Sequence, residues 1–165
     1  MKSGRALALI SGLITIVGTY VLTVSAALPN VSSGIGFITN LTDLFADPVG
    51  NAAYIGVDVW VYYILVVLFI VFLAAGVLQI IGMANRAVSF IFSLFPLAIG
   101  LMFFFLTYTD VLGIKSEFFE TYFEAAQIGG IFPFHVPLGD LGLGTYVLIA
   151  GGALGIISVF MKRKD

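Results

Sequence analysis

Four long runs of apolar residues, separated by more polar segments, dominate the chain. A helix that crosses a bilayer core of about 30 Å needs about 20 apolar residues, because each residue adds about 1.5 Å. Backbone amides surrounded by lipid must bond within their own segment, so such runs form helices. The pattern therefore predicts four membrane-spanning α-helices, over about residues 6–27, 59–83, 87–109 and 141–161.

The composition supports this interpretation. Hydrophobic residues make up 61% of the 165 residues and charged residues only 10%, and the mean hydropathy is +1.15. A soluble domain carries about 25% charged residues to cover its water-facing surface. We therefore predict an all-α, integral membrane four-helix bundle, in which residues 1–165 form a single domain and the lipid bilayer is part of the solvent.

The basic residues predict how the chain is oriented. Six of the seven fall on one side of a four-pass arrangement, and only Lys115 falls on the other side. The positive-inside rule then places both termini in the cytoplasm, in a plasma membrane, with outer loops over residues 28–58 and 110–140. A competing interpretation is a signal peptide cleaved after Ala26. The first apolar run is longer than a usual signal-peptide core, which favours a retained span.

Both outer loops are expected to contain a short amphipathic helix. In the first loop the apolar residues recur at helical spacing up to Asp47-Pro48; they are Phe37, Ile38, Leu41, Leu44 and Phe45. In the second loop Ser116 can cap a helix that runs to Gln127. One face of that helix would be acidic, with Glu117, Glu120 and Glu124. Either these helices cap the bundle at the membrane surface, or the acidic face binds a partner or lines a pore.

Two outer asparagines match the glycosylation sequon Asn-x-Ser/Thr, namely Asn30 and Asn40. Such triplets are common by chance. They are compatible with an external position of the first loop, and a modified Asn40 would have to face water.

Small residues predict where the helices approach one another. Gly151 and Gly155 form a G-x-x-x-G pair in the fourth span, and Ser11, Thr15 and Gly18 share one face of the first. These residues either pack the bundle internally or mediate self-association through the fourth span. In the third span Pro96 is expected to kink the helix, because it removes one backbone hydrogen bond.

The spans lack the groups that membrane chemistry usually needs. No ionisable residue lies at mid-depth, the chain has no cysteine, and His135 is its single histidine. Coupled transport, thiolate chemistry and a His-rich metal site are therefore disfavoured. We predict no enzyme activity, no metal or cofactor, no nucleic-acid binding and no identifiable small-molecule substrate.

The remaining function classes are non-catalytic. The first is a structural, scaffolding or accessory subunit that packs against copies of itself or other membrane subunits. The second is an oligomeric, cation-favouring channel with an outer ring of Asp58, Asp110 or Asp140. The third is cell–cell contact through the outer loops. The layout resembles that of claudins, tetraspanins and connexins, but these carry loop cysteines that this chain lacks, so no residue role is transferred.

Overall fold

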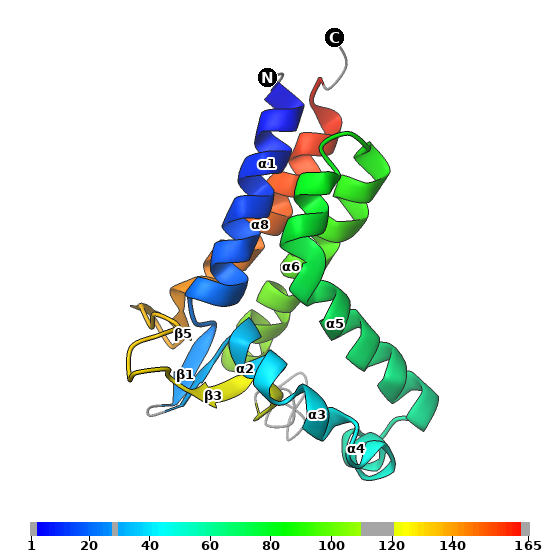
Figure 1. The fold of residues 1–165 in the computed structure, drawn as a ribbon, viewed down its shortest axis with the longest axis vertical. Helices are drawn as coiled ribbons and strands as arrows, with labels where there is room; N and C mark the ends of the chain where they lie inside the picture. Colours follow the sequence, from blue (N-terminus) through cyan, green and yellow to red (C-terminus); the bar gives the residue numbers. More distant parts are fainter. Residues whose placement is uncertain (1–2, 28–29, 110–120, 163–165) are drawn as a thin grey trace.

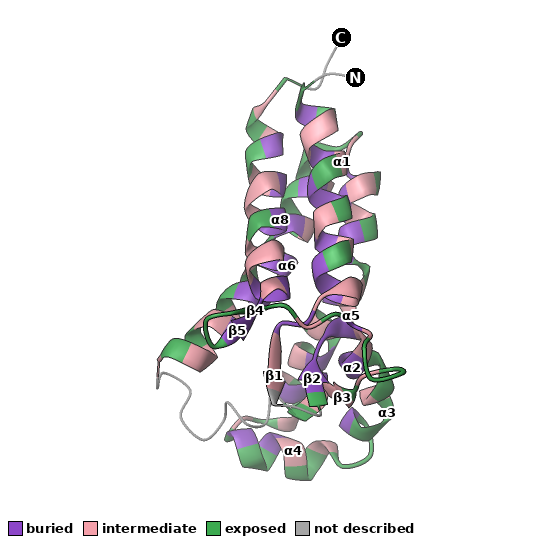
Figure 2. Ribbon diagram, turned by 90° about the vertical axis from the view of Figure 1, so that its left-hand side faces the viewer, coloured by how far each residue is buried: buried purple, intermediate pink, exposed green. Residues whose placement is uncertain are grey.

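The computed structural model describes residues 3–27, 30–109 and 121–162. Its framework is a bundle of four long helices, with the chain's two ends side by side at one end of the bundle (Figures 1 and 2). Each helix is long and apolar enough to cross a membrane. They are α1 (Ser3–Ile16) with its π-helical continuation η1 (Val17–Val21), α5 (Val59–Ile81), α6 (Arg86–Tyr108) and α8 (Leu143–Phe160).

The four helices form a closed ring in which α1 contacts α5, α5 contacts α6, α6 contacts α8, and α8 contacts α1. A tight turn joins α5 to α6. Asn85 caps α6 there, because its side-chain oxygen accepts a hydrogen bond from the Ala87 N–H at 2.9 Å. We call this end of the bundle the basic end, after Arg5, Arg86 and Lys162. The opposite end carries the loop elements, which we call the cap.

The first span ends earlier than the sequence predicts. The backbone becomes extended at Leu22, after the π-helical turn, and the chain enters strand β1 (Ser25–Ala27). The backbone at Thr23 and Val24 is held outside the helix because their carbonyls accept hydrogen bonds from Gly144 and Gly142, at 2.9 and 2.8 Å. Residues 22–27 therefore belong to the cap rather than to the span.

A three-stranded antiparallel sheet joins the two long loops. Its order is β1-β2-β3, with β2 (Asn30–Ser32) from the first loop in the middle and β3 (Glu124–Ala126) from the second loop at its side. Val31 pairs with both Ala26 and Ala125. Of the predicted helix over 116–127, residues 121–123 are helical as expected, but residues 124–126 are a strand. Glu117 and Glu120 lie outside the described residues.

The helix predicted in the first loop is divided into separate pieces. Helices α2 (Gly34–Thr39) and α3 (Leu41–Leu44) are separated at Asn40, and α4 (Pro48–Ile55) follows. Asp47-Pro48, where the sequence pattern predicts a helix end, also begins α4. The Asp47 carboxylate accepts a hydrogen bond from the Gly50 N–H at 2.9 Å, and proline suits the first helical position. A short hairpin, β4 (Pro137–Leu138) and β5 (Leu141–Gly142), completes the cap.

The interior differs between the two halves of the molecule. Near the cap, large side chains from α2, α5, α6 and the residue before β3 form an aromatic core. Toward the basic end, the buried residues are small and polar: Ser11, Thr15, Gln79, Ser89, Ser93 and Ser158. The small residues allow the helix backbones to approach closely, while the aromatic core fills the wider space between α5 and α6 beneath the cap.

Candidate functional site

The buried polar residues toward the basic end of the bundle include a hydrogen-bonded network that connects all four helices. Every one of them is completely buried, so none is in contact with the surface of the chain. In lipid the hydrophobic effect does not drive helices together, and interhelical hydrogen bonds and close packing take its place. The contacts that each residue makes therefore decide whether this network is a reaction site or a means of holding the bundle together.

Gln79 bonds a carbonyl that Pro96 leaves without its usual partner. In an α-helix the N–H of residue 96 would bond the carbonyl of residue 92, and proline has no N–H. The Gln79 side-chain nitrogen of α5 donates instead to the Phe92 carbonyl of α6, at 3.3 Å. A carbonyl freed inside lipid is costly, so a side chain from a neighbouring helix satisfies it. This pair joins α5 to α6 at the proline.

Ser11 extends the network to the other two helices. Its hydroxyl donates to the Gly151 carbonyl of α8 at 2.8 Å and lies 3.3 Å from the Gln79 side-chain oxygen. Gly155 lies directly against it, because an added Cβ there would sit 2.6 Å from the Ser11 hydroxyl and still closer to that of Ser93. One turn further along α8, Ser158 donates to the Gly155 carbonyl at 2.6 Å, and its hydroxyl lies 3.4 Å from that of Ser89 in α6.

The structure thus brings the predicted packing residues together between α1 and α8. Gly151 faces Thr15, whose hydroxyl oxygen would lie 2.6 Å from an added Cβ, and Gly18 packs against Leu148. The Thr15 hydroxyl is buried and makes no hydrogen bond within the described part of the chain. The G-x-x-x-G face of α8 is therefore covered by the chain's own α1 and α6, as expected for internal packing.

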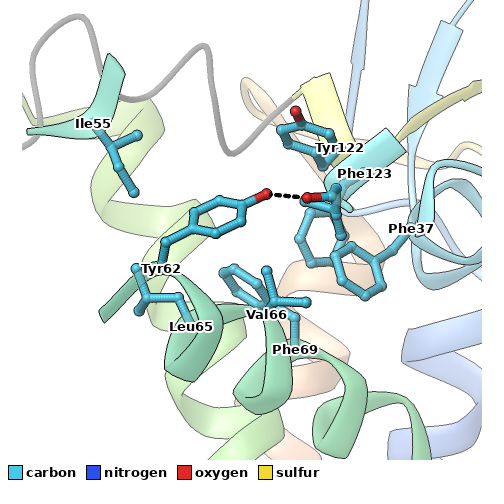
Figure 3. A pocket seen from close by; sticks show the side chains of 9 residues that line it. Phe37, Ile55, Tyr62, Leu65, Val66, Phe69, Tyr122 and Phe123 are labelled. Atoms are coloured by element: carbon cyan, nitrogen blue, oxygen red, sulfur yellow. Dashed lines mark hydrogen bonds between the residues drawn. The ribbon is translucent and has the colours of Figure 1, made fainter. Parts of the chain in front are cut away.

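The aromatic core of the cap centres on Phe123. Its ring lies 4.9 Å from that of Phe37, 5.2 Å from that of Phe103 and 5.6 Å from that of Phe69, measured between centroids. Figure 3 shows Phe123, Phe37 and Phe69 side by side, with Tyr62 reaching toward them from α5. Phe123 directly precedes β3, so the sheet places a second-loop side chain among residues of α2, α5 and α6.

A chain of hydrogen bonds closes one side of this core. The buried Tyr62 hydroxyl donates to the Leu44 carbonyl at 2.8 Å (Figure 3). Asn51 donates to the Tyr62 oxygen at 3.1 Å. Tyr122 donates in turn to the Asn51 side-chain oxygen, also at 3.1 Å. Burial raises the pKa of Tyr122. These contacts anchor α3 and α4 to α5 and the second loop.

The predicted acidic ring belongs to an oligomer, and a single chain shows only where its members lie. Asp58 and Asp140 are exposed, and Asp110 lies outside the described residues. Asp58 precedes α5 and Asp140 lies between β4 and β5, and Figure 1 shows these elements on opposite sides of the cap. A channel with such a ring would have to form it between subunits. Glu124 of the predicted acidic face is half-buried in β3.

The two sequon asparagines have different surroundings. Asn30 is exposed at the start of β2. The side-chain nitrogen of Asn40 lies at 2.7 Å from the Glu124 carbonyl and 3.3 Å from those of Thr121 and Tyr122. That nitrogen is the atom a glycan would modify, and in this structure it connects the first loop to the second. The sequence offered no sign of this role.

Two apolar grooves lie on the outside of the bundle. The larger, about 520 Å³, separates α5 from α6 and is lined by Leu65, Leu68, Phe69, Ile91, Leu94, Phe95, Ala98, Ile99 and Met102. The second, about 490 Å³, runs between α1 and α8. Both lie on helices that are long enough to span a membrane, so lipid tails or another span would contact them.

Potential catalytic and metal-binding groups are not gathered anywhere in the described ranges. No group of three His, Cys, Asp or Glu residues there could hold a metal ion. His135 bonds through its Nδ1 to the Thr23 hydroxyl at 2.8 Å, which attaches the second loop to the segment that follows the first span.

The fold and these contacts define a helical, multi-pass membrane protein whose buried polar groups join its own helices. Comparison with protein-family models, with curated proteins and with solved structures finds no match to this chain.

Proposed function

We propose that this protein is a non-catalytic structural, scaffolding or accessory subunit of a membrane assembly, with both termini on the cytoplasmic side of the plasma membrane. The single observation that carries the proposal is the use of the buried polar groups. Gln79, Ser11 and Ser158 bond backbone carbonyls of the bundle itself. These groups make the bundle a stable unit, which is what a scaffold requires.

The surface of the bundle supports the same proposal. The groove between α5 and α6 is apolar, and its rims include the exposed side chains Leu68 and Leu94. Another span, from a copy of this chain or from a different subunit, would gain packing contacts there without bringing a polar group into lipid. A subunit that acts through assembly needs such a surface, whereas a carrier needs polar groups facing a path through the membrane.

Purification from the native membrane in mild detergent, followed by mass measurement, tests the assembly. We expect a complex of fixed mass larger than one chain and its lipid. A photo-crosslinker at Leu68 or Leu94 should then join the chain to one defined neighbour. The same crosslinker at Ile157, an exposed residue of α8, serves as the matched control and should not. A strictly monomeric protein without crosslinks at the groove would refute the proposal.

The proposed orientation has a separate test, because the chain contains no cysteine. Single cysteines at Ala84, in the turn between α5 and α6, and at Asp140, in the cap, give a clean labelling pair. We expect a membrane-impermeant thiol reagent to label intact cells at residue 140 only. Labelling at residue 84 would show that the orientation is the reverse of the proposed one. The proposal of assembly would be unaffected.

A further inference from the structure

Three cationic side chains converge at the basic end of the bundle from three different parts of the chain. Arg5 lies in the first turn of α1, Arg86 is the first residue of α6, and Lys162 follows the end of α8. All three are exposed. Figures 1 and 2 place the start of α1 and the end of α8 side by side, and Figure 1 places the turn between α5 and α6 at the same end.

Backbone contacts hold these cations near one another. The Gly4 N–H bonds the Lys162 carbonyl at 3.1 Å, which connects the start of α1 to the end of α8. The Arg86 guanidinium donates to the Met161 carbonyl at 3.2 Å, which connects α6 to the same point. This contact uses one of the five N–H groups of the guanidinium. The cations are therefore part of one connected surface.

Among the described residues, no acid lies near this surface to balance its charge. The acids in the described ranges are Asp43, Asp47, Asp58, Glu124 and Asp140, and every one belongs to the cap or to the residue before α5. The two ends of the bundle thus carry opposite charge about one bilayer apart. Screening over about 10 Å at 0.1 M salt keeps the acids from neutralising the basic end.

We propose that Arg5, Arg86 and Lys162 form a binding site for the headgroups of anionic phospholipids. Each cation lies within one helical turn of the end of a span, which is the depth of lipid phosphates in a bilayer. Guanidinium and ammonium groups are suited to phosphate oxygens, the former through paired N–H groups. Charges at this depth attract anionic lipid by about 1 kcal/mol per Lys or Arg, or about five-fold in affinity. The site binds the bilayer around the bundle and does not depend on a protein partner.

The test is a titration of phosphatidylglycerol or phosphatidylcholine into the purified full chain in a neutral detergent, with bound lipid counted by native mass spectrometry. We expect phosphatidylglycerol to bind more tightly than phosphatidylcholine, and we expect its binding to weaken as the salt concentration is raised. The variant R5Q/R86Q/K162Q should lose about a hundred-fold in phosphatidylglycerol affinity. The charge-preserving variant R5K/R86K/K162R should keep most of it.

Two further variants distinguish a local site from a general effect of net charge or of misfolding. D58N/D140N changes the net charge by two at the cap, and it should leave the preference for phosphatidylglycerol unchanged. R5Q alone tests the site if the triple variant fails to fold, because the Arg5 side chain is exposed, and it should weaken binding about five-fold. Equal binding of both lipids, or an unchanged preference in R5Q and in the folded triple variant, would overturn the proposal.

Discussion

From the hydrogen bond between Gln79 and the Phe92 carbonyl we predict that the cost of replacing Gln79 depends on Pro96. Replacing Gln79 by methionine keeps the size of the side chain and removes its N–H groups, so the Phe92 carbonyl loses its partner. A buried acceptor left unbonded costs about 1–3 kcal/mol. The Ser11 hydroxyl keeps its bond to Gly151. We therefore expect Gln79→Met to lower the free energy of unfolding by about 2 kcal/mol.

The cost should depend on the proline. In a Pro96→Ala background, residue 96 regains an N–H that can bond the Phe92 carbonyl within α6. Gln79→Met then leaves no orphan acceptor and should cost only the net value of an interhelical hydrogen bond, about 0.6 kcal/mol. The difference between the two backgrounds gives a coupling energy of about 1–2 kcal/mol, obtained from a double-mutant cycle.

The free energies come from equilibrium unfolding in mixed micelles, in which the mole fraction of dodecyl sulfate is raised and helicity is followed. The four proteins measured are the original chain, Gln79→Met, Pro96→Ala and the double variant. Tyr62→Phe provides a control, because this residue lies in the aromatic core and its hydroxyl bonds Leu44. Its cost should be the same with either residue at position 96. If Gln79→Met were equally costly with proline and with alanine at position 96, the assignment of Gln79 to the freed carbonyl would be refuted.

Three further predictions test the packing and the cap by the same unfolding measurement. Gly155→Val should lower the free energy of unfolding by about 3 kcal/mol or more, because its Cβ would collide with the Ser11 and Ser93 hydroxyls. Valine at the exposed Ala150, which serves as the control, should have little effect. Asn40→Ala should cost about 1–2 kcal/mol, because the side-chain NH2 group loses its bonds to the second-loop carbonyls, and the exposed Asn30→Ala should cost almost nothing. The free energy of unfolding should fall above pH 10, because the pKa of Tyr122 is raised in the folded protein. The stabilisation by Tyr122 is complete below its unfolded pKa of 10.0 and is lost as the pH rises through its folded pKa. Tyr122→Phe should reduce that fall.

The membrane-spanning part of the fold could be predicted from the sequence because lipid leaves few alternatives. A long uncharged run must bond its own backbone, so its length and composition define a helix. The observed α5 and α6 start and end within two residues of the prediction. The small residues Ser11, Thr15, Gly151 and Gly155 were also sufficient to indicate a helix contact, because only small side chains permit it.

The cap could not be predicted in the same way, because its short segments depend on partners far away in the sequence. Residues 124–126 have a helical pattern when read alone, but they pair with β2, about 90 residues earlier. Tertiary pairing overrides local preference in segments this short. The role of Gln79 was accessible in principle, since a proline always frees the carbonyl four residues before it. Which side chain supplies the missing donor depends on how α5 faces α6.

The shared sheet also imposes an order on how the protein matures. Strand β2 can pair with β1 as soon as the first loop has been made, but its other edge stays open until β3 emerges, after the third span. In the proposed orientation, an unpaired strand edge thus remains on the translocated side during synthesis while two more helices insert. We therefore expect the chain to be most vulnerable to misassembly and proteolysis after the second span has been made and before residue 126 has been made. A chain truncated before β3 should be cleared rapidly from the membrane.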